Sequence, residues 1–301
     1  MNEPRDHHYV PQFYLRNFAT DPEKRKITTV AKNGEFAVWA ERSIESLGFE
    51  RDLYVFMQGT TPVSVESRIN SHIETPISQS DTWAKIASGR TEALDRSDKA
   101  ILYALIRHLE ARTPHYHASQ MELAHLAASP ASAIPFSDQE RIQYSEMRSD
   151  PELAKEFFNY MASSLEWTEQ NFRGSGLTIM RSKTRLRSSS TPVLTISAPP
   201  DPRLWLPLPG MTPFQYILTL TPTTMASLVL GDFDDAFLNV EVELDVSRGI
   251  NRYFVGQFGH SRHTRHLITD RDGLPAEMAW AHFETLKDSP RKMVFRRSAI
   301  A

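Results

Sequence analysis

Two adjacent histidines near the start of the chain are the residues best suited to chemistry. His7 and His8 are followed closely by a phenol, an amide and a guanidinium. Histidine moves protons near neutral pH, and arginine offsets negative charge on a phosphate. We therefore expect one of the two histidines to act as an acid/base catalyst or a metal ligand. The candidates for substrate binding in this segment are Tyr9, Gln12 and Arg16.

A second polar set lies on a helix predicted over residues 95–117. On a helical wheel Arg112 falls inside the apolar stripe and His108 falls at its edge. An unpaired buried charge is very costly, so Arg112 must find a partner. We expect His108 and Arg112 to meet the N-terminal histidines in one site, joined by His115 if the helix runs through Pro114. Alternatively, Arg112 binds an internal carboxylate or carbonyl groups and holds the fold together.

Two carboxylates and one amide complete the set of candidates. Glu66 and Glu74 lie about two helical turns apart in a helical pattern over residues 63–87. Either could act as a base or help to hold a divalent metal such as Mg²⁺ or Mn²⁺. Exposed helix charges of no special role are the ordinary alternative. Asn251, on a helix predicted over residues 245–258, is a further candidate for substrate binding.

The opening segment should contain an extended stretch followed by a helix. The residue before a proline avoids the helical region, so Pro11 is expected to begin a helix that runs to Asp21. Neighbouring side chains in an extended segment point to opposite faces. We therefore expect His7 to face the site and His8 to be buried beside Val10. Free N–H groups at the start of the helix would attract an anion.

The remaining pattern predicts an α+β fold. Asn33-Gly34 between two β-rich runs, residues 26–31 and 35–40, is a strong hairpin signal. Further helices are predicted over residues 117–128, 137–147, 151–165 and 275–286, and further strands over 177–180, 193–197, 204–208, 216–220, 226–230 and 293–295. We expect one domain over residues 1–301, in which a helical middle packs against an N-terminal β-hairpin and a C-terminal mixed sheet. The alternative is a subdivision into a mainly helical part, 1–175, and a mainly β part, 176–301.

Composition excludes several classes of protein. The 301 residues include no cysteine, which rules out disulfides and thiolate nucleophiles. The sequence has no membrane-spanning apolar run and no signal-peptide pattern at its start, so we expect a cytoplasmic protein. The net charge is −3, yet basic residues gather locally and could bind a nucleic acid or a nucleotide. These basic runs are residues 181–187, 262–266 and 291–297.

The opening phrase, His7 to Phe18, resembles the start of the family catalogued as domain of unknown function 4238. Members of that family begin with His-His-Tyr-Val-Pro, as this chain does at residues 7–11. Three further segments are similar to the family pattern: residues 50–54, the helix that ends in Arg112-Thr113-Pro114, and residues 191–202 followed by residues 206–230. Where the family typically has Thr-Ser-Asp-x-Pro, this chain reads Thr195-Ile196-Ser197-Ala198-Pro199 and lacks the aspartate. The family's activity is not established, so the resemblance implies no reaction.

Dinucleotide-binding and phosphate-binding glycine motifs are missing, as are the Gly-x-Ser-x-Gly and His-Glu-x-x-His motifs. The combination of histidine, arginine and carboxylate favours a hydrolase that acts on a phosphodiester, with a nuclease as the first choice. The alternative is a non-enzymatic nucleotide-binding or nucleic-acid-binding protein in a defence or regulatory system. A third hypothesis is a structural role, in which the N-terminal phrase locks the first helix onto the core.

Overall fold

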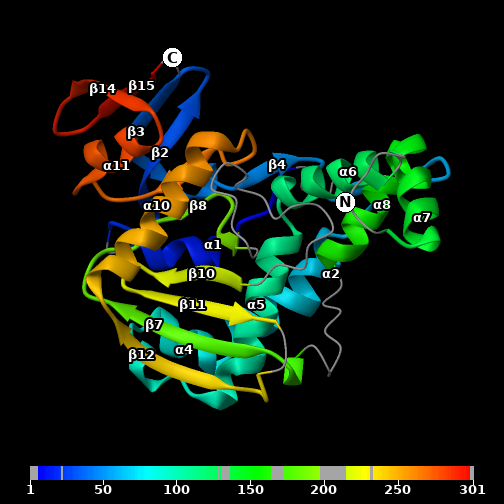
Figure 1. Cartoon of the computed structure of the whole chain (residues 1–301), viewed down its shortest axis with the longest axis horizontal. Helices are drawn as coiled ribbons and strands as arrows, with labels where there is room; N and C mark the ends of the chain where they lie inside the picture. The colour runs from blue at the N-terminus through cyan, green and yellow to red at the C-terminus, as the bar shows by residue number, and fades with distance from the viewer. Residues whose placement is uncertain are drawn as a thin grey trace.

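The computed structural model describes residues 6–21, 23–127, 129, 136–163, 172–196, 215–230 and 233–298. These residues form two large sheets, two smaller two-stranded sheets and a group of helices. The fold is α+β, as predicted. The helices α6 (Pro114–Ala127), α7 (Asp138–Ser149) and α8 (Pro151–Ser163) gather at one end of the molecule, away from both sheets (Figure 1). The long helix α10 (Leu244–His260) runs between the two sheets and shares a buried core with them.

The six-stranded sheet is antiparallel throughout and joins distant parts of the chain. Its strand order is β14 (Phe283–Asp288), β15 (Met293–Arg297), β3 (Phe36–Ser43), β2 (Lys26–Asn33), β13 (His266–Ile268) and β8 (Ser188–Ser189). The predicted hairpin is confirmed as β2–β3, and Gly34 takes the positive φ of 61° that its turn requires. Strands from both sides of residue 175 therefore share one sheet.

The five-stranded sheet is mixed and comes mainly from the second half of the chain. Its order is β12 (Phe237–Val242), β7 (Gly176–Ser182), β11 (Thr224–Val229), β10 (Gln215–Thr221) and β9 (Val193–Ile196). β12 pairs with β7 in parallel, and the other pairs are antiparallel. The helix α5 (Lys99–Ala111) packs against β9, β10 and β11. The apolar stripe of α5 is thereby buried against this sheet.

The smaller elements connect these layers. They are β1 (Asp6–His8), which pairs with β4 (Phe49–Arg51), the hairpin of β5 (Val55–Gln58) and β6 (Thr61–Ser64), the helices α1 (Gln12–Leu15), α2 (Glu66–Ile69), α3 (Thr75–Ser78), α4 (Asp81–Ala87) and α11 (Leu274–Trp280), a π turn over Asn70–Glu74, and 3₁₀ turns over Arg16–Phe18, Ile44–Ser46, Thr91–Ala93 and Arg96–Asp98. Each of the helices predicted over 117–128, 137–147, 151–165 and 245–258 is present.

Three helix predictions need correction. The helix expected from Pro11 to Asp21 is only one α turn followed by one 3₁₀ turn, with Pro11 as the N-cap. A helix this short has too small a dipole to attract an anion to its N-terminus. The helix expected over 95–117 breaks after Ala111, because a residue that precedes a proline avoids the helical region. Residues 283–288 form β14 rather than helix, since Phe283 is buried and pairs with β15.

Two other predictions fall partly or wholly on residues that the structure does not describe. The strand predicted over 204–208 lies outside the described residues. The segment Thr195 to Pro199, where the family's aspartate is missing, is described only at its first two residues, which belong to β9.

Gly48 lies between the 3₁₀ turn Ile44–Ser46 and β4, and it holds the N-terminal phrase in place. Its carbonyl accepts hydrogen bonds from the N–H groups of Tyr9 and Val10, at 2.7 and 3.0 Å. Its φ is +64°, and a Cβ atom there would lie 2.6 Å from the Cβ of Val10. Only glycine satisfies both conditions.

We expect Gly48→Ala to lower the free energy of unfolding by about 2 to 4 kcal/mol, the sum of a left-handed backbone and an overpacked contact. Gly59→Ala is the matched control, because Gly59 has a φ of +63° but no atom within 4 Å of the added Cβ. Urea denaturation gives the free energy of unfolding of each variant. The difference between the two losses is the cost of the steric clash with Val10, because both variants share the cost of a left-handed backbone. Equal losses in the two variants would contradict the clash.

Candidate active site around Arg112

The side chain of Arg112 is completely buried where α5 ends. Its Nε donates to the hydroxyl of Tyr54 at 3.0 Å, and its Nη1 donates to Nε2 of His108 at 2.9 Å and to the carboxylate of Glu74. Its Nη2 donates to the backbone carbonyl of His8. We call Arg112, Tyr54, Glu74, His108 and His7 the Arg112 cluster. As the sequence required, the buried guanidinium has a carboxylate partner.

The N-terminal strand presents its two histidines to different surroundings, as alternation in a strand demands. His7 is 1% exposed, its ring stacks on Tyr54 at 5.5 Å, and its Nδ1 accepts the Tyr54 backbone N–H at 2.9 Å. The ring of His8 is partly exposed beside Phe49, with Nε2 at 3.3 Å from the carbonyl of Glu45. The prediction that His8 is buried is therefore wrong. Its ring points away from the Arg112 cluster, and only its backbone carbonyl bonds Arg112.

A π turn places Glu66 and Glu74 on one side of their helix. Thr75 donates its N–H to the carbonyl of Asn70, five residues back. Pro76 has no N–H with which to continue the regular pattern, which accounts for the irregular turn at this point. In a regular α-helix these glutamates would be about 80° apart around the axis, and the extra residue of a π turn removes most of that offset. Such turns are frequent at functional sites.

The two glutamates have opposite protonation behaviour. Burial raises the pKa of Glu66 to about 7, despite the attraction of Arg112. Burial acts on Glu74 in the same direction, but the charge of Arg112 and contacts with Arg112 and His108 bring its pKa down to about 2. Near neutral pH, Glu74 is an anion and Glu66 is divided between its two forms. Carboxyl groups whose pKa values are driven apart are typical of acid/base sites.

The neighbouring helices α5 and α8 carry buried polar groups without charge, His108 and Asn159. Burial and the charge of Arg112 lower the pKa of His108 to about 4, so its imidazole is neutral. Its Nε2 accepts from Arg112, and at 4.0 Å it is too far from Glu74 for a hydrogen bond. Asn159 is fully buried on α8, a helix that packs against α2 and α5. Within the described residues, both polar atoms of the Asn159 amide and Oε2 of Glu66 have no hydrogen-bond partner.

The structure brings together His7, Glu66, His108 and Arg112, with the carbonyl of His8, but it places the other candidates elsewhere. Tyr9 is buried and bonds Ser190. Gln12 is partly buried on α1, and Arg16 is exposed on the 3₁₀ turn that lies against β10. Because α1 is a single turn, Arg16 does not continue a helical surface toward the Arg112 cluster. His115 lies in the first turn of α6 and approaches Ser261 instead of extending the ridge of α5.

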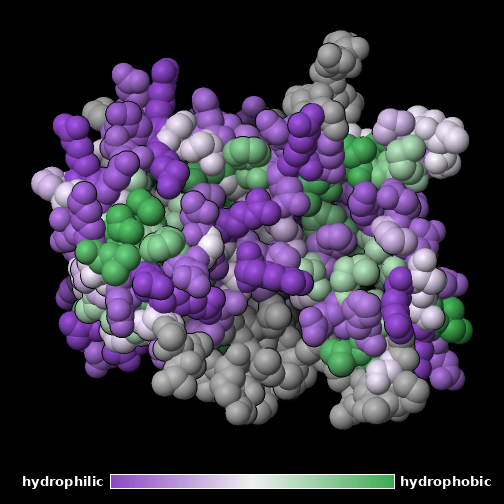
Figure 2. Space-filling view, turned by 90° about the horizontal axis from the view of Figure 1, so that it is seen from above, coloured by the Kyte–Doolittle hydropathy of each residue, from purple (hydrophilic) through white to green (hydrophobic). Residues whose placement is uncertain are grey.

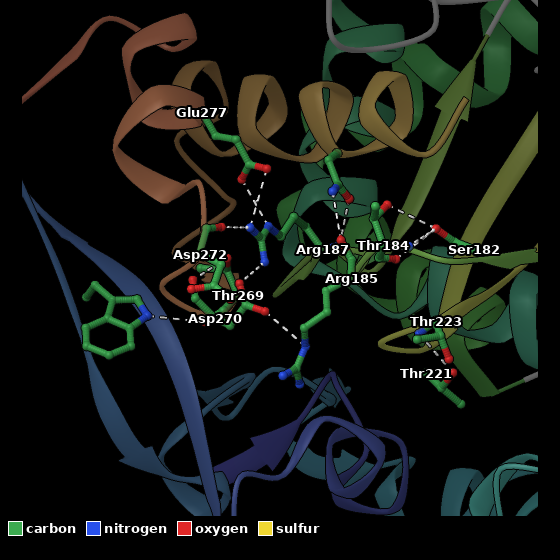
Figure 3. Close-up of polar contacts among 12 residues, drawn as sticks. Ser182, Thr184, Arg185, Arg187, Thr221, Thr223, Thr269, Asp270, Asp272 and Glu277 are labelled. Carbon is green, nitrogen blue, oxygen red and sulfur yellow. Dashed lines mark hydrogen bonds and ion pairs between the residues drawn. The ribbon is translucent and has the colours of Figure 1, made fainter. Parts of the chain in front are cut away.

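Asn251 belongs to a different polar cluster, centred on Arg187. Asn251 accepts the backbone N–H of Arg187 at 2.8 Å and donates to the carbonyl of Arg185 at 2.9 Å. The Arg187 guanidinium bonds Asp270, Glu277 and the carbonyl of Asp272, as Figure 3 shows. The adjoining cavity is about 20 Å³, room for about one water. This cluster joins the loop before β8 to α11, and its contacts are structural.

Sequence reasoning missed the chemistry of Tyr54 and Asn159. The hydroxyl of Tyr54 donates to the carbonyl of Arg112 at 3.0 Å and so caps the C-terminal end of α5. The same hydroxyl accepts a hydrogen bond from the Arg112 guanidinium. A tyrosine in the family-like segment 50–54 was a usable signal. Asn159 sits among apolar residues of α8 and carried no signal. In the described part of the chain, no three His, Asp or Glu side chains converge to hold a metal ion.

Comparisons with known proteins give one match. The model of a family described as protein of unknown function (DUF4238) matches residues 6–229, which include every residue of the Arg112 cluster. No curated protein and no solved structure matches the chain. Among the described residues, no helix combines the length and the apolar character needed to cross a membrane.

Proposed function

Since the chain belongs to the DUF4238 family, a family of proteins of unknown function, we propose its activity from the site itself: it is a hydrolase that cleaves phosphodiester bonds of nucleic acids. The observation that carries the proposal is the pair of glutamates beside a buried arginine: Glu74 binds Arg112 and has a pKa of about 2, whereas Glu66 has a pKa of about 7. A carboxyl group that titrates near neutral pH can both take and return a proton during turnover.

Glu66 is the general base in this proposal. Its Oε2 is shielded from solvent and lacks a partner within the described residues, as does the nearby helix's Asn159 amide. Unpaired buried groups of this kind bind water or ligand atoms. The ionised Glu66 takes a proton from a water molecule whose oxygen bonds to phosphorus. The ester P–O bond breaks, and the leaving oxygen takes a proton from solvent.

Arg112 is a positioning residue rather than a phosphate ligand. All three of its nitrogens donate to groups of the protein itself, which leaves the guanidinium committed to Glu74, His108, Tyr54 and the His8 carbonyl. It links the N-terminal strand to the π turn that carries Glu74, and it keeps Glu74 ionised. The negative charge of Glu74 in turn helps to keep the pKa of Glu66 high. A change at Arg112 should therefore alter the pH profile of the reaction.

We expect Glu66→Gln to lower kcat/KM on labelled DNA or RNA strands by about 10²- to 10⁴-fold, the usual contribution of a general base. In the wild type, kcat/KM should rise with pH up to about 7 and then level, and the glutamine variant should lack this rise. Glu156→Gln, at an exposed position of α8, is the charge-matched control. A broad panel of DNA and RNA left uncut by the wild type, with and without added Mg²⁺ or Mn²⁺, would contradict the proposal.

The titration of Glu66 should also appear in the pH dependence of stability, which can be measured without substrate. The pKa of Glu66 is higher in the folded chain than its ordinary value of 4.5, so the folded state holds the proton more tightly. The resulting stability is present at pH values below about 4.5 and is lost as pH rises through about 7. This loss should be missing from the Glu66→Gln variant.

The second candidate function is a binding protein without turnover. The full engagement of Arg112 within the protein favours it, since a guanidinium that is already satisfied offers little to a transition state. In that case the chain binds a nucleotide or a nucleic acid, Glu66→Gln leaves affinity unchanged, and no cleavage appears at any pH.

A further inference from the structure

A basic loop, residues 261–265, connects α10 to β13 and is held firmly in place. Lys32 donates its ammonium to the carbonyl of Ser261 at 2.6 Å. Farther along the loop, the hydroxyl groups of Thr264 and Thr191 lie 3.0 Å apart, and the N–H of Arg265 donates to Ser190 at 2.9 Å. Its side chains are therefore presented from a fixed backbone. The face seen from above is largely hydrophilic, with apolar residues in separate small patches (Figure 2).

The arginines of this loop are not neutralised equally. Arg265 pairs with Glu50 at 3.3 Å. Arg262 is exposed and donates its Nε to Nε2 of His263 at 3.1 Å. Among the described residues, no carboxylate lies within 4.0 Å of Arg262. The Nε of Arg262 donates to a neutral ring, and its other N–H groups face solvent. A guanidinium with free donors of this kind can bind an anion.

Histidines from α6 face the same loop. Nδ1 of His115 lies 3.4 Å from Oγ of Ser261, which also accepts the N–H of His263 at 3.2 Å. The rings of His115 and His263 are 6.4 Å apart. The groups that face His263 are thus His115 and Ser261, together with the charged or titratable side chains of Arg262, Arg265, His117 and Lys32.

These surroundings keep the imidazoles uncharged. Burial, together with His263, lowers the pKa of His115 to about 4. Burial, then Arg262 and Arg265, then His117 and Lys32, lower the pKa of His263. A bound anion would reverse the electrostatic part of this effect, because it stabilises the protonated ring. The arrangement would therefore take up a proton when an anion binds.

The basic loop lies close to the Arg112 cluster. His115 follows Arg112 by three positions, so their Cα atoms are at most about 11 Å apart. The N-terminal phrase connects the two places, since the His8 carbonyl bonds Arg112 while the next residue, Tyr9, bonds Ser190 beside the loop.

We propose that Arg262, His263 and His115 form a phosphate-binding subsite for the backbone of a nucleic-acid strand. The subsite rests on the proposed function, because it binds the backbone of the strand that the hydrolase cleaves. Arg262 donates two N–H groups to phosphate oxygens. His263 takes up a proton at Nε2, which ends the hydrogen bond that this atom accepts from Arg262, and the protonated histidine rings then donate to the phosphate.

The test measures binding apart from cleavage. In the Glu66→Gln background and with EDTA present, a fluorescein-labelled 12-nucleotide strand is titrated at several salt concentrations. Arg262→Ala and His263→Gln are compared with Arg248→Ala, an equal change of charge at an exposed position of α10, about 20 Å along the helix from the loop. Inorganic phosphate serves as competitor, and NMR of histidine-labelled protein follows His263 with and without phosphate.

We expect at least a fivefold loss of affinity for Arg262→Ala and for His263→Gln, and less than a twofold loss for Arg248→Ala. The salt dependence of binding should weaken by about one ion for Arg262→Ala. Phosphate should compete with the strand and raise the pKa of His263. Equal affinities for Arg262→Ala and Arg248→Ala, or no response of His263 to phosphate, overturn the subsite. Absence of cleavage in the wild type with loop-dependent binding intact would contradict the hydrolase proposal and leave the subsite standing.

Discussion

Replacing Arg112 with methionine is expected to lower the free energy of unfolding by about 3 to 5 kcal/mol, the usual effect of removing one partner from a buried ion pair. The change leaves Glu74 with most of its carboxylate shielded from water and without its cation. It also leaves the His8 carbonyl and the Tyr54 hydroxyl without the donor that now reaches them. Guanidinium chloride denaturation at pH 7 measures the loss.

Two comparisons define the cause of that loss. Arg248→Ala, an exposed arginine, should change stability by no more than about 0.5 kcal/mol. Combining Arg112→Met with Glu74→Gln should cost less than the two single changes together, because the orphaned charge is gone. The pKa of Glu74 is held near 2, so this stability is present above about pH 4.5 and is lost as pH falls through about 2. A loss below 1 kcal/mol for Arg112→Met would contradict the buried network.

A chain that ends at residue 229, where the family match ends, is expected not to fold. The missing part supplies β12 to the five-stranded sheet, and it supplies β13, β14 and β15, half of the six-stranded one. It also carries completely buried side chains, among them Phe254, Phe258 and Phe295. Arg187 would lose Asp270 and Glu277 and become an unpaired buried charge.

Circular dichroism and proton NMR of residues 1–229 test this expectation against the full chain. We expect weak secondary structure, poorly dispersed methyl signals and no cooperative melting. Cooperative unfolding of the shortened chain with dispersed methyl signals would show instead that the matched region is an independent domain. Adding the 230–301 segment as a separate polypeptide is a further control, because restored folding would show that the two parts need contact but not connection.

The parts of the fold set by local chemistry could be predicted from the sequence. Asn33-Gly34 specifies the β2–β3 turn, and Ser137 with Glu140 forms the capping box that begins α7. The position of Arg112 on the apolar side of its helix correctly indicated a buried arginine that needs a partner, and the structure shows that Glu74 is one of its partners. In each case the determining residues lie within a few positions of one another.

The rest of the site depends on contacts between distant segments. Glu74 shares a side with Glu66 because of the π turn, and regular helical geometry gives no warning of it. The roles of Tyr54 and Asn159 depend on how α8 and β5 pack, which periodicity does not encode. Asn251 has the residue type of a substrate ligand, yet it braces the backbone of Arg187. Residue type and local pattern alone could not separate that structural use from a functional one.

The bond from Arg112 to the carbonyl of His8 spans 104 positions of the chain, which has a consequence for biosynthesis. At translation rates of about 5 to 20 residues per second, His8 is added to the chain roughly 5 to 20 s before Arg112. During that interval Tyr9 and Val10, which are both buried in the finished protein, have only part of their binding surface. The N-terminal phrase is therefore a segment that a nascent-chain chaperone would encounter undocked, and mutations at Arg112 would prolong its exposure.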